Sequence, residues 1–167
     1  MSRAGTIDGL QFARGRDRVS GSIGIDALPR LAATGCDAAT LAYRVRGGEN
    51  GGGRLSLTIE ISGELGLVCQ RCLGPLAFPL AARSELELAE TESEIEAAED
   101  EIDRVLATKA MDVATLVEDE AILALPMAPL HERCETGVAP DAAVKAGPFA
   151  SLAGLRRANG GSNGSSR

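Results

Sequence analysis

Aromatic side chains are nearly absent from this sequence, which has no Trp, one Tyr and three Phe among 167 residues. The hydrophobic core must therefore consist of Leu, Val, Ile and Ala, although the apolar content of 44% is ordinary for a globular chain. No apolar run approaches the roughly 18–20 residues that a membrane-spanning helix requires. The first five residues lack the apolar stretch of a secretory signal. We therefore expect a cytoplasmic protein with no membrane partner.

The signatures of common enzyme classes are also missing. The glycine-rich stretch 51–53 lacks the Lys and the Ser or Thr that a phosphate-binding loop requires. The only histidine, His131, lies three residues before Cys134, but neighbouring loop positions give no reason for a nucleophile and a base to align. The consecutive carboxylates at 118–120 would point in different directions on a helix, which favours a solvated face over an acid–base pair. The sequence predicts a protein that is not an enzyme and has no small-molecule substrate.

Charge is unevenly distributed along a chain whose net charge is −7. Residues 1–84 contain ten Arg and seven acidic residues, whereas residues 85–120 contain fourteen acidic residues and two basic ones. Proteins that bind nucleic acid over a broad surface gather basic side chains, so this composition argues against such binding by the whole chain. The N-terminal half could still form a basic patch that contacts phosphates, although ordinary solvation of strand faces explains the arginines of this half slightly better. The candidates for phosphate contacts are Arg14, Arg16, Arg18, Arg44, Arg46, Arg54 and Arg71.

Alternation of apolar and polar residues predicts strands with one solvated face. The clearest segments are 40–46 and 54–62, and the glycine-rich stretch 47–53 between them predicts a hairpin. Pro79 indicates an edge or a bulge in a later strand. Further strands are expected at 10–12, 19–23, 65–69, 76–88 and 102–107.

One principal helix is predicted at about 112–125. Asp112 is a suitable N-cap, apolar residues recur at helical spacing after it, and Pro126 stops the helix. A short flanking helix is expected at 26–31 with Asp26 as its cap, and an acidic solvated loop at 89–101. The fold class that follows is α+β, with a mainly antiparallel sheet that is curved or barrel-like.

The C-terminal part differs in composition from the rest. We expect a single α+β domain over 1–134, a linker with a short amphipathic motif over 135–157, and a disordered tail over 158–167. The motif could dock on a partner groove or fold back on its own sheet, and the pattern favours neither. Its apolar stripe consists of Phe149, Leu152 and Leu155.

Two pairs of metal-binding side chains have the same spacing. Cys69 and Cys72 are separated by two residues, as are His131 and Cys134, and a Cys₃His set of this kind suits a tetrahedral zinc ion. Gly74 would let the backbone turn beneath the first pair. Alternatively, the cysteines are simply reduced without metal. A redox CxxC is a weaker alternative, because thioredoxin-type thiols lie at a helix N-terminus and this motif follows a strand.

Cys36 has no metal-binding neighbour in the sequence. A free cysteine in that setting is usually a small core residue. We expect it to be buried among apolar side chains.

Three strings, in order, resemble the YceD family of large ribosomal RNA subunit accumulation proteins. They are 67–72 followed by Pro75, 117–126 followed by Pro129, His131 and Cys134, and 148–157. The resemblance implies a role in accumulation and processing of large-subunit ribosomal RNA, without enzymatic activity. Many members carry a second cysteine cluster that looks like part of a four-ligand zinc site. This sequence has only Cys134 there, with His131 upstream, so a histidine would replace one thiolate.

The function we expect is therefore that of a non-catalytic ribosome-biogenesis factor for 23S rRNA. Its partner would be the rRNA precursor or the pre-50S particle, engaged through a protein partner that the acidic stretch attracts. A zinc-stabilised protein–protein adaptor without RNA contact is the first alternative, and a thiol oxidoreductase the second. The candidate binding residues are Arg71, Glu118, Asp119, Glu120, Phe149, Leu152 and Leu155.

Overall fold

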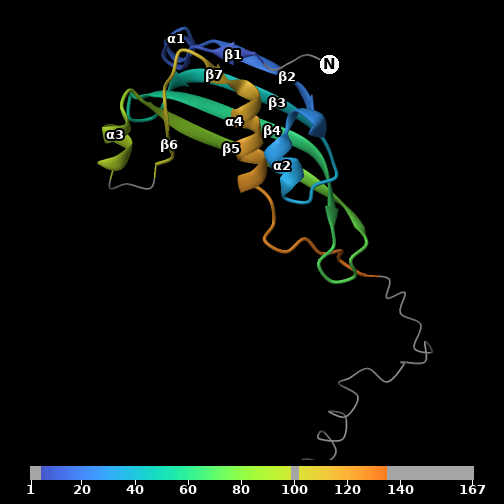
Figure 1. Ribbon diagram of the computed structural model, residues 1–167. Coiled ribbons are helices and arrows are strands. Elements are labelled where there is room, and N and C mark those ends of the chain that lie inside the picture. The colour runs from blue at the N-terminus through green and yellow to red at the C-terminus, as the bar shows by residue number, and fades with distance from the viewer. Residues whose placement is uncertain (1–4, 99–101, 135–167) are drawn as a thin grey trace, which may run out of the picture. The chain divides into compact units, whose positions relative to one another are not determined.

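A five-stranded sheet packed against helices organises the chain in the computed structural model, which describes residues 5–98 and 102–134 (Figure 1). The fold class is α+β, as predicted. The elements in chain order are β1 (Thr6–Ile7), α1 (Gly9–Arg14), β2 (Arg18–Gly24), a 3₁₀ turn (Ile25–Ala27), α2 (Pro29–Ala33), β3 (Ala38–Glu49), β4 (Leu55–Val68), β5 (Pro75–Ala89), α3 (Glu92–Glu96), β6 (Arg104–Leu106), β7 (Met111–Asp112) and α4 (Val113–Leu123).

The strand order in the main sheet is β2-β3-β4-β5-β6. The pairings from β2 to β5 are antiparallel, and β6 runs parallel to β5, so the sheet is mixed. Strands β1 and β7 form a separate two-stranded ribbon. Within the described residues β2 and β6 lie at opposite ends of the order and do not pair. The sheet is therefore open, and the barrel-like form that the sequence also allowed is wrong.

Alternation along the strands places the core on one face of the sheet. Every second residue from Leu41 to Val45 and from Leu57 to Ile61 is buried. The residues between them are more exposed. Helices α1, α2 and α4 contribute to the same hydrophobic cluster, so they cover the same face. Figure 1 shows α2 and α4 side by side on this face.

Strand β4 is one uninterrupted strand where the sequence predicts two, at 54–62 and 65–69. The Ser-Gly-Glu at 62–64 suggests a break, but Gly63 pairs with Leu41 in register. A Cβ at this position would collide with the carbonyl oxygen of Thr40. Glycine is therefore needed here for close approach of two strands, and not for a turn.

Two further predictions about local structure are wrong. Residues 10–12, expected to be extended, lie in α1, because Asp8 accepts a hydrogen bond from the Gln11 backbone N–H at 3.0 Å and begins a helix there. The acidic stretch 89–101, expected to be a loop, contains the short helix α3.

Helix α4 confirms the predicted principal helix. Asp112 is its N-cap and accepts a hydrogen bond from the Ala114 N–H at 2.9 Å. The helix ends at Leu123, two residues before the predicted end and ahead of Pro126. None of the helices in the described part of the chain combines the length and apolar character needed to cross a membrane.

The short helix expected at 26–31 is divided and has a different cap. A 3₁₀ turn that includes Asp26 precedes α2, whose N-cap is Leu28, with no side-chain cap of its own. Glu118 of α4 supplies the missing acceptor, because its Oε1 binds the Leu31 N–H at 3.0 Å and the Arg30 N–H at 2.6 Å. Asp26 is not the cap, and a residue 88 positions from Arg30 takes that role.

Candidate metal centre

The two halves of the predicted Cys/His set meet at the end of the β4–β5 hairpin. Cys69 directly follows β4 and Cys72 lies in the turn before β5, while His131 and Cys134 come from the segment after α4. One ligand atom from each residue lies within 4.8 Å of the others. The tertiary structure thus brings together two pairs that are 58 or more residues apart in the chain, and this cluster could hold a metal ion.

Two of the distances between ligand atoms fit the edges of a tetrahedral site. The sulfur atoms of Cys69 and Cys134 are 3.7 Å apart, and Cys72 Sγ lies 3.4 Å from His131 Nδ1. With Zn–S bonds of about 2.3 Å and Zn–N bonds of about 2.0–2.1 Å, the edges of a tetrahedron are about 3.8 Å and 3.5 Å. Three thiols and one imidazole form a donor set typical of zinc.

A tight turn presents the first pair of thiols. The Cys69 N–H donates to the Gly74 carbonyl and the Leu73 N–H to the Cys69 carbonyl, each at 2.9 Å. Leu73 has φ = +59°, the left-handed conformation that glycine adopts most easily. Gly74, the residue expected to permit the turn, does not have a positive φ. The strained position is thus one residue earlier than the sequence indicates.

His131 is held in the orientation that a ligand needs. Its Nε2 lies 3.0 Å from the carbonyl oxygen of Pro75, so Nε2–H donates to that carbonyl and leaves Nδ1 free to bind metal. The His131 backbone N–H also points to Cys69 Sγ at 3.4 Å. A second bond, from the Gln70 N–H to the Pro129 carbonyl at 2.9 Å, joins the two segments.

Arg71 also joins the CxxC turn to the segment after α4. Its guanidinium donates to the His131 carbonyl oxygen at 2.9 Å. The candidate binding residue Arg71 therefore holds the loop after α4 against the CxxC turn.

The thiols of the cluster differ in acidity. Burial raises the pKa of Cys69, but N–H groups of Cys72, His131 and Arg71 donate to its sulfur and together lower the pKa to about 5. Burial and the neighbouring Cys69 and Cys72 sulfurs raise the pKa of Cys134 to about 11. N–H groups directed at a thiolate are common around metal-bound cysteines, because they stabilise the charged form.

The three consecutive carboxylates of α4 have separate environments. Glu118 is 4% exposed and Glu120 is 8% exposed, so the predicted solvated face is wrong for both. Glu118 binds Arg30 at 2.9 Å, and Asp119 binds the same guanidinium at 2.7 Å. Asp119 is half-exposed and keeps access to a partner, whereas the Glu118 carboxylate is already bound within the fold.

The arginines of the N-terminal half are spread over several sites. Arg18, Arg44 and Arg46 share one face of β2 and β3. Arg83 on β5 lies on the same face, and the sequence analysis missed it. The period-2 pattern of β5 could have revealed it, because Arg83 alternates with apolar positions.

Arg54 and Arg14 have structural partners, and Arg16 is exposed in the turn between α1 and β2, with a positive φ. Arg54 binds Glu87, whose side chain is 4% exposed and which also binds Arg104 at 3.0 Å. Arg14 lies 3.9 Å from Glu90.

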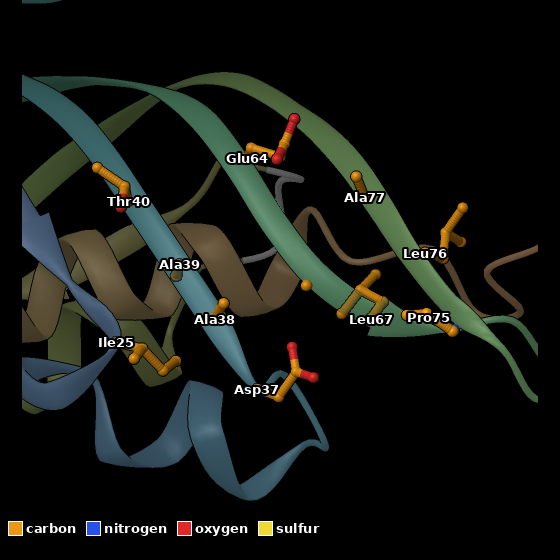
Figure 2. Close-up of a pocket in the computed structure, with 11 residues that line it drawn as sticks. Ile25, Asp37, Ala38, Ala39, Thr40, Glu64, Leu67, Pro75, Leu76 and Ala77 are labelled. Atoms are coloured by element: carbon orange, nitrogen blue, oxygen red, sulfur yellow. The ribbon is translucent and has the colours of Figure 1, made fainter.

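A hollow of about 610 Å³ opens between the ends of β3, β4 and β5 (Figure 2). Its titratable lining residues are Asp37 and Glu64, and the other described lining residues are apolar or small, apart from Thr40. Figure 2 shows α4 behind the strands, so the hollow is on the sheet face opposite this helix. None of the four cluster residues lines it, although Pro75, whose carbonyl oxygen is bound by His131, does.

Other predicted features have simpler outcomes. Cys36 is 3% exposed and belongs to the hydrophobic core, as expected. The amphipathic stripe of Phe149, Leu152 and Leu155 lies outside the described residues, as do the predicted linker and tail.

The fold and the cluster define a small α+β protein with a Cys₃His set that could bind a metal ion. Residues 57–156 match the model of a family described as large ribosomal RNA subunit accumulation protein YceD, and the chain belongs to this family. The match includes β4, β5, α4 and all four residues of the cluster. No solved structure matches the chain.

Proposed function

We propose that this protein is a non-catalytic factor of ribosome biogenesis that supports accumulation and processing of 23S rRNA. The observation that carries the proposal is the family match, which extends over β4 from Leu57, β5, the principal helix and the whole Cys/His cluster. The precursor rRNA or the pre-50S particle is the target, reached in part through a protein partner. Asp119, which is half-exposed, and Phe149, Leu152 and Leu155 are the residues we assign to partner contacts.

The Cys/His cluster serves this function as a structural zinc site. Four protein ligands complete a tetrahedron and leave no open position for water or substrate, the arrangement of structural sites. The ion would tie the segment after α4 to the β4–β5 hairpin. Zinc supplies no chemistry to a reaction here, and its contribution is to the stability of this junction.

Zinc content tests the ligand set. Purified protein should contain about one zinc per chain, and His131→Ala should lose it, because three ligands bind far more weakly than four. His131→Cys should retain zinc, since it completes a four-thiolate set. Cys36→Ala is the matched control and should retain zinc as well, because Cys36 lies in the core. Metal-free protein that is fully folded would contradict the assignment.

The biological role is tested by deletion of the coding sequence. Cells that lack the protein should accumulate fewer 50S particles and more unprocessed large-subunit rRNA, measured by sucrose-gradient profiles and by probes against precursor ends. Normal profiles would overturn the proposed function.

A zinc-stabilised adaptor without RNA contact is the second candidate, favoured by the acidic residues around α3 and α4. Ultraviolet crosslinking in cells separates the two, because an adaptor yields no rRNA fragments. A thiol oxidoreductase is the least supported, since the CxxC lies in a strand-to-strand turn and not at a helix N-terminus.

A further inference from the structure

The sheet face opposite α1, α2 and α4 carries a row of arginines. Arg18 of β2 pairs in register with Arg46 of β3, and Arg44 pairs with Glu60 of β4, which in turn pairs with Arg83 of β5. Paired residues on neighbouring strands point to the same side of a sheet, so all five side chains project from one face. The core lies on the other side.

Three of these guanidinium groups surround a single carboxylate. Glu60 binds Arg46 at 2.6 Å, Arg44 at 3.3 Å and Arg83 at 3.4 Å. The three arginine side chains are 45–70% exposed, so they stay accessible while Glu60 holds them side by side. One carboxylate cannot neutralise three guanidinium groups.

The charge of this face contrasts with that of the chain. Its four arginines, with Glu60 and the exposed Glu85 in the adjoining row, give 4 − 2 = +2, whereas the whole chain carries −7. The acidic groups Asp37 and Glu64 lie farther along the same sheet, at the hollow in Figure 2. Glu60 and Glu64 are separated by about 13 Å along β4. The positive potential is therefore confined to one end of the face.

The side chains beside the arginines show which partner suits them. The next row across the sheet consists of Ser22, Ala42, Ser62 and Ala81, which are all small and exposed. No aromatic residue projects from these rows, because Tyr43 is buried on the core side. Protein interfaces usually rely on large apolar or aromatic anchors, and base recognition relies on stacking. A surface of small side chains with exposed guanidinium groups instead suits phosphates.

We propose that the arginine face, defined as Arg18, Arg44, Arg46 and Arg83, binds the sugar–phosphate backbone of structured RNA without reading its sequence. The proposal rests on the function proposed above and names the surface that would contact rRNA. Arg44 and Arg46 lie about 7 Å apart along β3 and face the same side, so adjacent phosphates can be bound by adjacent guanidinium groups.

Fluorescence anisotropy with a labelled RNA hairpin of arbitrary sequence tests the surface, using the full chain with its zinc. Three phosphate contacts predict that affinity falls by roughly 40-fold between about 50 and 200 mM salt. Arg44→Gln/Arg46→Gln/Arg83→Gln should bind at least about tenfold more weakly at the lower salt and lose most of this salt dependence. Arg14→Gln is the control for a single substitution. It removes one positive charge from α1, on the opposite face, and should bind like the unaltered chain, whereas Arg44→Gln alone should already weaken binding.

A variant that gains affinity excludes misfolding as the explanation. Glu60→Gln removes the one carboxylate among the arginines and should bind the hairpin more tightly, whereas Glu64→Gln should have little effect. Unchanged binding in the triple variant, weaker binding by Glu60→Gln, or a preference for poly-glutamate over RNA would each overturn the proposal.

The two proposals fail separately. If the deletion strain loses 50S particles and the triple variant restores them fully, the arginine face is wrong and the biogenesis role stands. If the deletion strain is normal while the triple variant loses RNA affinity, the surface stands and the biogenesis role is wrong.

Discussion

Glu118 is the residue whose sequence context is least informative about its role. Next to Asp119 and Glu120 it resembles a solvent-facing acid, yet its carboxylate accepts hydrogen bonds from the Leu31 and Arg30 N–H groups at the start of α2. A helix needs acceptors for its first N–H groups, and α2 has no side chain of its own to supply them. The acid is buried because its partners are distant in the chain and close in the fold.

Glu118→Ala should lower the free energy of unfolding by about 2–4 kcal/mol, because it leaves two backbone N–H groups without their acceptor and removes one of the partners of the Arg30 guanidinium. Urea unfolding measures the change. Asp119→Ala is the control: Asp119 binds the same Arg30 but is half-exposed, and its loss should cost less than about 1 kcal/mol. Equal effects in the two variants would show that Glu118 is not a cap.

The buried carboxylates also predict how stability depends on pH. Burial raises the pKa of Glu118, but N–H groups of Leu31 and Arg30 lower it further, so the net pKa is below its usual range. Burial likewise raises the pKa of Glu87, and Arg104 and Asn50 lower it overall. A depressed folded-state pKa means that the unfolded chain binds protons first on acidification.

Stability from these carboxylates is therefore complete above the usual carboxyl pKa of about 4.3 and is lost as the pH falls through the lower folded-state values. Denaturant titrations from neutral pH down to about pH 3 should show this loss, and Glu118→Gln should reduce its steepness. A stability that rises toward acid pH would contradict the assignment.

Among the elements, those with strong local signals are the ones that the sequence predicts well. Asp112 and the apolar spacing after it identify α4, and alternation identifies β3 and β5. Pro79 indicates an edge or a bulge, because proline has no backbone N–H to donate to a neighbouring strand. Strand β5 pairs with β6 only at 87–89, so on that side Pro79 has no neighbouring strand in the described sheet. Asp8, the N-cap of α1, is also a local signal, but the apolar residues at 10 and 12 alternate with Gln11 and so predict a strand instead.

Gly63 shows why β4 was divided in the prediction. Gly63→Ala should lower the free energy of unfolding by about 1–3 kcal/mol, because the added methyl would displace the backbone at Thr40. Gly48→Ala, on the adjacent strand, has nothing within 4 Å of the added Cβ and should be neutral or slightly stabilising. Thermal unfolding of the pair measures the difference, and a neutral Gly63→Ala would show that the strands can separate locally.

On the scale of the whole molecule, the Cys/His cluster connects the last described segment to the sheet. Chelation of zinc should lower the melting temperature, because the junction of Gln70 with Pro129 and of Arg71 with His131 would lose its central ion. Differential scanning calorimetry with and without chelator measures the shift, and re-added zinc should reverse it. Cys69→Ser should melt at the chelated temperature and respond to neither treatment.

The sequence by itself determined the fold class, the principal helix and the identity of the four metal-binding candidates, because caps, periodicity and ligand spacing are local properties. Only the tertiary structure decided that the two ligand pairs meet, that Glu118 is a cap within the fold, and that Arg83 joins Arg18, Arg44 and Arg46 on one face. These outcomes depend on strand register and helix placement. Such long-range contacts are set by the packing of the whole core and leave no signal within a short window of residues.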